Sequence, residues 1–163
     1  MDISFTGAAD LYRVARWAQD AGRKDLRREL DKASRRAGGI IETEIRKDAP
    51  DYVPSGFRPR LRQNLETKTS VRVLQQRRIT VTVGARGKRG RRHVKDMNEG
   101  TLRHPVYGRN RRLKDGTLQA NKWVDQRIRP GLVDEPGLRV MPAAKQEIGK
   151  ALQAVVAKLG RAG

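Results

Sequence analysis

Apolar residues spaced by three and four positions set the first constraint on what this chain can fold into. The longest such run comprises Leu26, Leu30, Ala33, Ala37, Ile40, Ile41 and Ile45. Because an α-helix has 3.6 residues per turn, this spacing gathers the apolar side chains on one face and leaves charged residues on the other. The run predicts an amphipathic helix of roughly six or seven turns. It ends at Ala49-Pro50, since proline disfavours helical backbone in the preceding residue, and Gly38-Gly39 predicts a bend or close packing inside it.

Helical spacing also occurs nearer to both ends of the chain. A shorter run over residues 8–20 is separated from the long one by Gly22, so residues 8–49 form a helical region. At the other end, Ile148, Leu152, Val155 and Leu159 predict a closing helix over residues 141–160. Met141-Pro142 would open this helix, because proline is tolerated in the first turn.

The middle of the chain carries the two-residue period of β-strands. Leu65, Thr67, Thr69, Val71 and Val73 alternate with polar residues, and three apolar residues between positions 79 and 83 do the same. Residues 61–84 are therefore predicted to form an antiparallel hairpin that turns through Gln75–Arg78.

Turn residues and short apolar runs indicate the structure of the remaining segments. Residues 51–60 are expected to form a loop, and Trp123–Ile128 a third strand within a strand-and-connector segment, residues 123–138. Between them, residues 85–122 are expected to be a long basic loop excursion with a short helix near His93–Glu99. The chain is thus predicted to be one α+β domain, residues 1–163, with a long N-terminal amphipathic helix and a C-terminal helix packed on a small antiparallel β-sheet.

Positive charge is concentrated in the same middle segment. Residues 51–130 hold 21 basic and 6 acidic side chains, whereas residues 1–50 hold 11 and 9, and residues 131–163 hold 5 and 3. The formal net charge of the chain is +19, and only 36% of its residues are hydrophobic. Such a chain folds against its own repulsion, so other subunits or a polyanion are expected to complete its burial and neutralise it.

The densest cations of this segment are the candidate contact residues. They are Arg86, Lys88, Arg89, Arg91, Arg92, Arg109, Arg111 and Arg112. Such a run is equally compatible with contacts to DNA phosphates that read no sequence and with ion pairs to acidic groups of a neighbouring subunit. Aromatic residues make up only 4% of the chain, which disfavours base stacking. Tyr107 and Trp123 are expected to anchor packing or an interface.

The sequence offers no defensible catalytic or metal-binding group. His93 and His104 are too few for a zinc site, and the carboxylates around Glu44 and Asp48 are flanked by lysine and arginine, which indicates an ion-paired helix face. The loop around Gly87 lacks the Walker spacing. We therefore expect no enzyme activity, cofactor or metal. The chain has no cysteine, signal peptide or apolar run of about 20 residues, which fits a reducing cytosol and no membrane.

The order of several short motifs resembles a known family. They are Lys47-Asp48-Ala49-Pro50, Ser55-Gly56, Val83-Gly84, Asn98-Glu99-Gly100-Thr101, His104-Pro105-Val106-Tyr107-Gly108 and Arg129-Pro130-Gly131, followed by a C-terminal helix. Over residues 24–160 this order is similar to that of the neck, or tail-completion, proteins at the head–tail junction of long-tailed bacteriophages (siphophages). The stretch 109–122 is longer than is usual in that family.

The resemblance implies a virion structural subunit without catalysis. Such a subunit would be assembled in the host cytoplasm into a homo-oligomeric ring, a hexamer, between the head-completion (stopper) protein and the tail terminator protein. DNA would pass through the lumen. Gly100 would permit a tight turn, and Glu99 would pair with an arginine of its own or of an adjacent subunit. The alternative is a free basic nucleic-acid-binding protein of the ribosomal or nucleoid type, which contacts phosphates without sequence readout.

Overall fold

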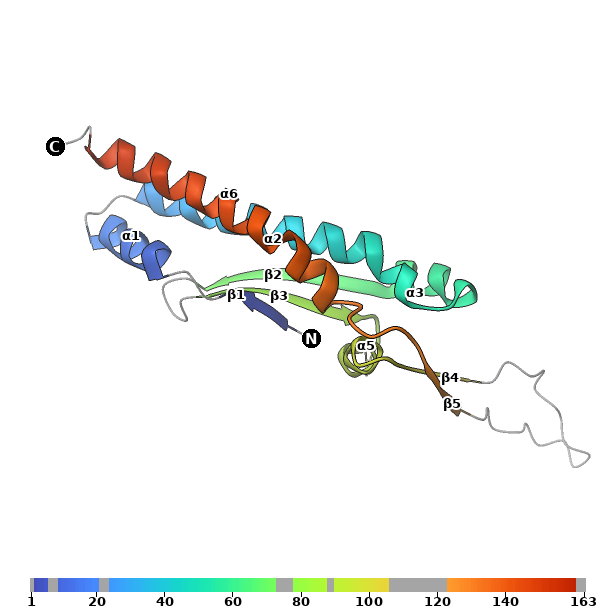
Figure 1. Cartoon of the computed structure of the whole chain (residues 1–163). Coiled ribbons are helices and arrows are strands. Elements are labelled where there is room, and N and C mark those ends of the chain that lie inside the picture. The colour runs from blue at the N-terminus through green and yellow to red at the C-terminus, as the bar shows by residue number, and fades with distance from the viewer. Residues whose placement is uncertain are drawn as a thin grey trace, which may run out of the picture.

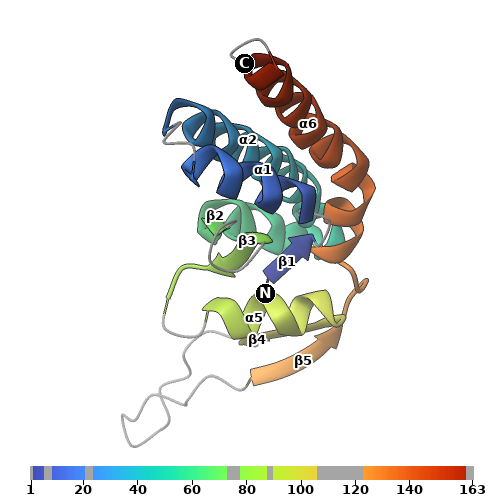
Figure 2. The same cartoon turned by 90° about the vertical axis from the view of Figure 1, so that its left-hand side faces the viewer.

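The long helices form one layer of the molecule. The computed structural model describes residues 2–5, 9–20, 24–72, 78–87, 90–105 and 123–160. Helices α1 (Ala9–Asp20), α2 (Lys24–Asp48) and α6 (Asp134–Gly160) lie together above the sheet (Figure 1). Ion pairs join Glu29 to Lys158 and Arg36 to Glu147, the latter at 2.6 Å. The N-terminal part of α2 thus lies beside the C-terminal part of α6, and the two helices run antiparallel (Figure 2).

The second layer is a three-stranded antiparallel sheet in the order β1-β3-β2. It comprises β1 (Asp2–Phe5), β2 (Leu65–Arg72) and β3 (Arg78–Ala85). Alternation along β3 places Ile79, Val81 and Val83 in the core, where all three are fully buried. These residues pack with the apolar stripe of α2, so the helices cover one face of the sheet.

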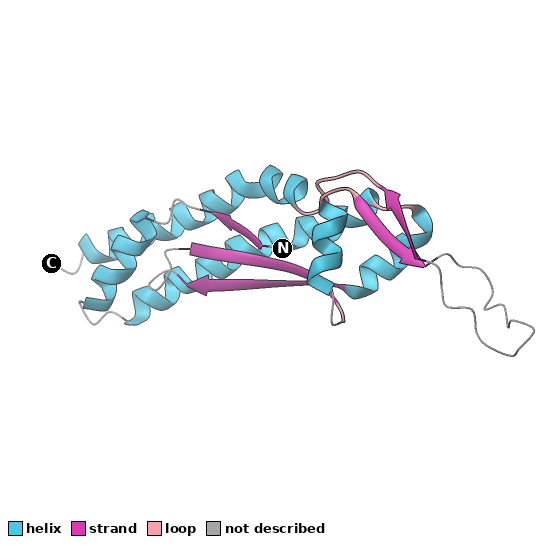
Figure 3. Cartoon of the chain, turned by 90° about the horizontal axis from the view of Figure 1, so that it is seen from below, coloured by secondary structure: helices cyan, strands magenta, loops and turns pink. Residues whose placement is uncertain are grey.

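The other face of the sheet is polar and points away from the long helices. Seen from below, the strands lie in front of those helices (Figure 3). The register of β2 and β3 sets Lys68 opposite Thr82 and Ser70 opposite Thr80. Residues directly opposite each other in an antiparallel pair share a face, so these four side chains lie on the uncovered side.

A smaller unit lies at one end of the sheet. It contains α5 (Gly90–Asn98) and a two-stranded antiparallel sheet of β4 (Thr101–Pro105) and β5 (Trp123–Arg127). Chain segments η1 (Ala49–Tyr52), η2 (Ser55–Phe57) and α3 (Arg58–Asn64) lead from α2 to β2. None of the helices in the described part of the chain is long and apolar enough to cross a membrane.

The predicted α+β class, with a long N-terminal helix and a C-terminal helix packed on a small antiparallel sheet, is confirmed, but several boundaries were wrong. Residues 51–60 are not a loop, because Pro50 and Pro59 each lie at the start of a short helix, where a missing N–H is harmless. The hairpin begins at Leu65, after α3. Arg78 belongs to β3, and the rest of the predicted turn lies outside the described residues.

Three further expectations were wrong. Residues 85–122 are not all loop, since they include α5 and β4; the short helix expected near His93–Glu99 is confirmed. The third strand, β5, pairs with β4 and not with the hairpin. The closing helix begins at Asp134 rather than at Met141, because acidic residues and Pro136 all suit a first helical turn. Pro142 therefore lies inside α6, and the N-terminal strand β1 was not foreseen.

Close packing at Gly38 is confirmed. A Cβ atom at this position would lie 2.3 Å from Cγ2 and 2.9 Å from Cβ of Thr69 on β2. Rotation about χ1 cannot relieve a contact with Cβ itself, because Cβ is fixed by the backbone. At Gly39 an added Cβ would meet nothing within 4 Å.

This difference gives a matched pair of variants. Gly38→Ala is expected to lower the free energy of unfolding by about 1–3 kcal/mol, because it forces α2 away from β2. Gly39→Ala is expected to raise that free energy by up to about 1 kcal/mol, through helix propensity alone. Urea denaturation followed by circular dichroism measures both, and equal effects would contradict this packing.

Candidate functional site

Asn98 at the end of α5 organises a junction between three parts of the chain. Its side chain is 7% exposed, and Oδ1 accepts hydrogen bonds from the backbone N–H groups of Val133, at 2.7 Å, and Asp134, at 3.1 Å. Its Nδ2 donates to the carboxylate of Asp134 at 2.8 Å. The first N–H groups of a helix have no partner within that helix. Asn98 of α5 supplies the hydrogen-bond acceptor that these N–H groups lack, and so fixes where α6 begins.

Two glycines hold the chain on either side of this contact. Gly100 has a φ of +92° and Gly131 a φ of +87°, both in the region that favours glycine. The carbonyl of Gly100 accepts the N–H of Ile128 at 2.9 Å, and the carbonyl of Asn98 accepts the N–H of Gly131 at 2.8 Å. The expected tight turn at Gly100 is confirmed. The Asn-Glu-Gly-Thr and Arg-Pro-Gly motifs are therefore bonded directly to each other.

The short helix η1, which follows α2, reaches the same junction. The Tyr52 hydroxyl donates to Glu135 at 2.7 Å, and the Arg129 guanidinium pairs with Glu135 and lies 4.6 Å from the centre of the Tyr52 ring. The Tyr52 hydrogen bond and, after it, Arg129 lower the pKa of Glu135, against the opposing effect of burial. Burial and the Glu135 carboxylate raise the pKa of Tyr52. These contacts tie the first turn of α6 to η1.

Arg139 makes the neighbouring link, from α6 back to α2. It pairs with Glu44 at 2.6 Å and with Asp48. The Lys-Asp-Ala-Pro motif thus contributes Asp48 to an ion pair and two buried residues, Ala49 and Pro50, to the core. Three motifs that lie far apart in the sequence meet at one junction, and their role there is structural. Sequence reasoning missed Tyr52 and Glu135, and it included Arg129 only as part of a motif, without its role. A tyrosine within a supposed loop was the available signal.

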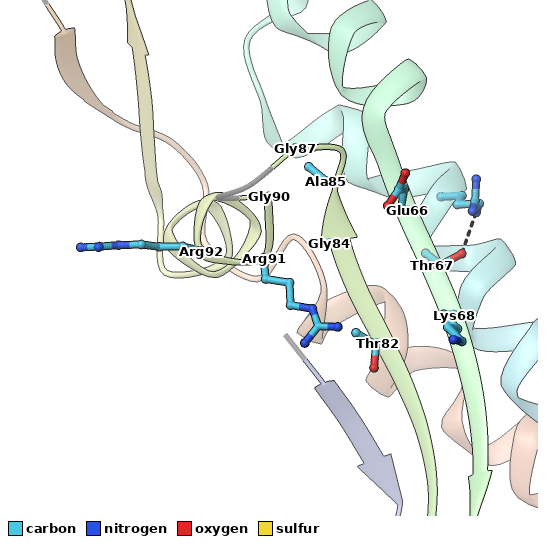
Figure 4. A pocket seen from close by; sticks show the side chains of 11 residues that line it. Glu66, Thr67, Lys68, Thr82, Gly84, Ala85, Gly87, Gly90, Arg91 and Arg92 are labelled. Atoms are coloured by element: carbon cyan, nitrogen blue, oxygen red, sulfur yellow. Dashed lines mark hydrogen bonds between the residues drawn. The ribbon is translucent and has the colours of Figure 1, made fainter.

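The predicted contact cations that the structure describes lie apart from this junction, at the place where α5 meets the sheet. Of the eight, Arg86, Arg91 and Arg92 are described and exposed. Arg91 extends along β3 toward Thr82, whereas Arg92 points away from the sheet (Figure 4). Arg86 pairs with Glu66 at 3.4 Å. Lys88, Arg89, Arg109, Arg111 and Arg112 lie outside the described residues, as does Tyr107.

The two remaining candidates have mixed outcomes. Glu99 pairs with Lys95 at 3.7 Å, one helical turn away, and not with an arginine of the described chain. A contact with an adjacent subunit stays a prediction. Trp123 begins β5, in register with Pro105, and the position of its side chain lies outside the description.

A groove with more basic than acidic side chains lies where α5 meets the sheet. Its volume is about 860 Å³, and its lining includes Arg46, Glu66, Lys68, Thr82 and Arg91. A Cβ at Gly90 would lie 1.5 Å from the Ala85 carbonyl oxygen, so only glycine lets α5 start this close to β3. Lys68 and Arg46 were missed from the sequence. The alternation along β2 was the signal for Lys68, because it places this residue on the polar face.

The two histidines line a separate hollow of about 240 Å³. Its other walls include Phe57, Leu61 and Met97. Within the described ranges, no group of three or more His, Cys, Asp or Glu side chains could hold a metal ion.

Most carboxylates are already engaged inside the chain. Among the carboxylates whose side chains are described, all but Asp31 and Asp96 form an ion pair or accept a hydrogen bond. The ion-paired ones are Asp20, Glu29, Glu44, Asp48, Asp51, Glu66, Glu99, Asp125, Glu135 and Glu147. Glu42 accepts from Thr67 and Thr69, and Asp134 accepts from Asn98. The surplus of cations therefore remains on the surface with little free acid to meet it.

Comparison with known proteins found no matching family model, no matching curated protein and no matching solved structure.

The Asn98 contact predicts a specific loss of stability. Asn98→Ala leaves the buried N–H of Val133 and the partly buried N–H of Asp134 without their partner, and is expected to lower the free energy of unfolding by about 1–3 kcal/mol. Asn64→Ala serves as the control, since the side chain of Asn64 bonds to the Arg60 carbonyl within its own helix and its loss should change stability by less than about 0.5 kcal/mol. Chemical denaturation of both variants measures the difference. If the two variants lose the same amount, Asn98 does not hold the start of α6.

The Tyr52 contact predicts a change in the titration of Glu135. Tyr52→Phe removes the strongest cause of the lowered pKa, so the pKa of Glu135 should rise toward its ordinary value of 4.5. A lowered carboxyl pKa contributes stability above its unfolded value and loses it as the pH falls through the folded value. The variant should therefore lose less stability than the wild type on acidification below 4.5. Carboxyl-carbon NMR titration checks the shift, and an unchanged pKa would contradict it.

Proposed function

We propose that this chain is a non-enzymatic structural subunit of the bacteriophage neck. In this proposal, copies form a homo-oligomeric ring between the head-completion protein and the tail terminator, around the channel through which DNA passes. The observation that supports it most is the meeting of the motifs around Asp48, Asn98 and Gly131 at one junction. Motifs that resemble those of the neck family thus occupy positions on which this fold depends.

The distribution of apolar residues also fits a subunit that associates through its helices. The large hydrophobic side chains that are exposed among the described residues are Trp17 on α1 and Leu138 and Val156 on α6. Each is more than half exposed, and all three belong to the helical layer. Interfaces between subunits carry such apolar and aromatic anchors at their centre. A ring built through α1 and α6 would bury them.

The alternative is a free basic protein that binds nucleic acid through phosphates. The observation in its favour is the set of exposed cations without a carboxylate partner, which includes Lys68 and Arg91. The two proposals differ in what a single copy can do. A free binding protein binds duplex DNA as a monomer, whereas a ring subunit gains its affinity from many copies placed around the same DNA.

Particle composition tests the neck proposal directly. Purified particles of the phage that encodes this chain should contain it, and cryo-electron microscopy should place a ring of it at the head–tail junction. Absence of the chain from purified particles would overturn the proposal.

Binding by the isolated chain separates the two candidates. At about 150 mM salt, a ring subunit should bind a duplex of random sequence no more tightly than about 10⁻⁴ M, the weak end of nonspecific binding. Fluorescence anisotropy gives the dissociation constant, and size-exclusion chromatography with light scattering confirms that the sample is monomeric. A monomer that binds at about 10⁻⁶ M or tighter would favour the free binding protein.

A further inference from the structure

We propose that the uncovered face of the three-stranded sheet, together with Arg91 of α5, binds the phosphate backbone of duplex DNA. This phosphate face is defined by Lys68, Ser70 and Arg72 on β2, Thr80 and Thr82 on β3, and Arg91. The choice of DNA as the polyanion rests on the proposed function, but binding by the face does not require a ring.

The strand register builds a surface of cations and hydroxyl groups. Lys68 lies opposite Thr82, and Ser70 lies opposite Thr80, all on the side away from α2. The neighbouring positions Thr67 and Thr69 are bonded to Glu42 of α2, which fixes the direction of the alternation. Lysine, arginine, serine and threonine are the side chains that hold phosphate oxygens in protein–DNA complexes.

Gly84 extends this surface toward α5. A Cβ at Gly84 would lie 3.4 Å from Cγ of Arg91, so the stem of Arg91 lies directly on the strand. Its guanidinium group is directed toward Thr82, over the face and away from the body of α5 (Figure 4). Arg91 thereby joins the cations of β2, although it belongs to a different element.

The cations of the phosphate face outnumber the acids of the sheet, which are Glu66 on β2 and Asp2 on β1, the latter in register with Thr82. In the described part of the chain, Lys68, Arg72 and Arg91 form no ion pair. Glu66, the nearest acid on β2, pairs with Arg86. On the outer side of α2, by contrast, the unpaired Asp31 lies one helical turn from Arg27 and Arg35 and offsets their charge. The phosphate face is therefore the better surface for a polyanion.

The chemistry of this face favours DNA over a protein partner. A protein interface has an apolar or aromatic centre from which lysine is depleted. The described residues of the phosphate face include no large apolar side chain, and the exposed hydrophobic ones lie on α1 and α6. A second copy of the chain also offers little free acid, because nearly all of its described carboxylates are engaged internally. The scarcity of exposed aromatics indicates a duplex, bound through its backbone, in preference to stacked single strands.

Salt-dependent binding of the full chain tests this assignment. Lowering the salt to about 50 mM strengthens phosphate contacts, so a single copy becomes measurable by anisotropy with a random-sequence duplex. Lys68→Gln with Arg91→Gln should weaken binding by roughly tenfold for each phosphate interaction that is removed at that salt. The slope of log K against log salt should become shallower by about 1.8. The matched control, Lys32→Gln with Arg35→Gln, removes the same charge from exposed positions on α2 and should change both quantities much less.

Each outcome decides the assignment. Equal weakening by the two double variants would mean that binding follows net charge, and it would overturn the phosphate face. DNA binding as tight as that of the wild type by the Lys68 and Arg91 double variant would also overturn the assignment. If that variant keeps DNA binding but loses binding to poly-glutamate, the face binds an acidic protein. Circular dichroism verifies that each variant is folded. If the chain is absent from virions yet the variant loses DNA binding, the neck proposal fails while the phosphate face stands.

Discussion

The hydrogen bonds of Asn98 determine how the two halves of the molecule fit together. The side-chain oxygen of Asn98 accepts hydrogen bonds from the N–H groups at the start of α6. Its backbone carbonyl accepts one from the N–H of Gly131, just before that helix. With its start fixed, α6 runs back along α2 and places Arg139 against Asp48 and Glu147 near Arg36. The helical layer therefore depends on a residue from the small unit at the far end of the sheet. The motifs around this contact are short because each supplies only one or two groups to it.

The ion pairs of the chain make one side of its surface more positively charged than the other. The ion pairs between α2 and α6 use acids of one helix to neutralise bases of the other. Exposed pairs of this kind contribute little stability each, about 0–1 kcal/mol. Their larger consequence is that they consume the carboxylates. The sheet and α5 carry few acids, and in the described part of the chain Lys68, Arg72, Arg91 and Arg92 form no ion pair. A charge difference visible in the sequence thus becomes a difference between two sides of the fold.

The periodic elements could be predicted from the sequence, whereas their partners and ends could not. The runs at Leu26–Ile45 and Leu65–Val83 lie on elements whose apolar faces are buried, so pattern alone located them. The start of α6 was missed because its cap, Asn98, lies 36 residues away, beyond any local signal. The pairing of β5 with β4 is likewise a long-range choice. At the candidate site, Arg91 was predicted from charge, but its convergence with Lys68 depends on Gly84 and Gly90, which allow α5 to approach β3.

A net charge of +19 makes the two sides of the molecule energetically dependent on each other. In the proposed ring, copies that associate through Trp17, Leu138 and Val156 would bring their cations together, and that repulsion would oppose assembly. Any ligand that binds the assembled state more tightly than the separate chains shifts the equilibrium toward assembly. A polyanion held on the phosphate face would act in this way, because it lowers the repulsion that apolar contacts alone must overcome. In the proposed ring, the scarcity of free carboxylates among the described residues would then have a physical role, because copies that cannot neutralise one another would assemble best around a polyanion that can.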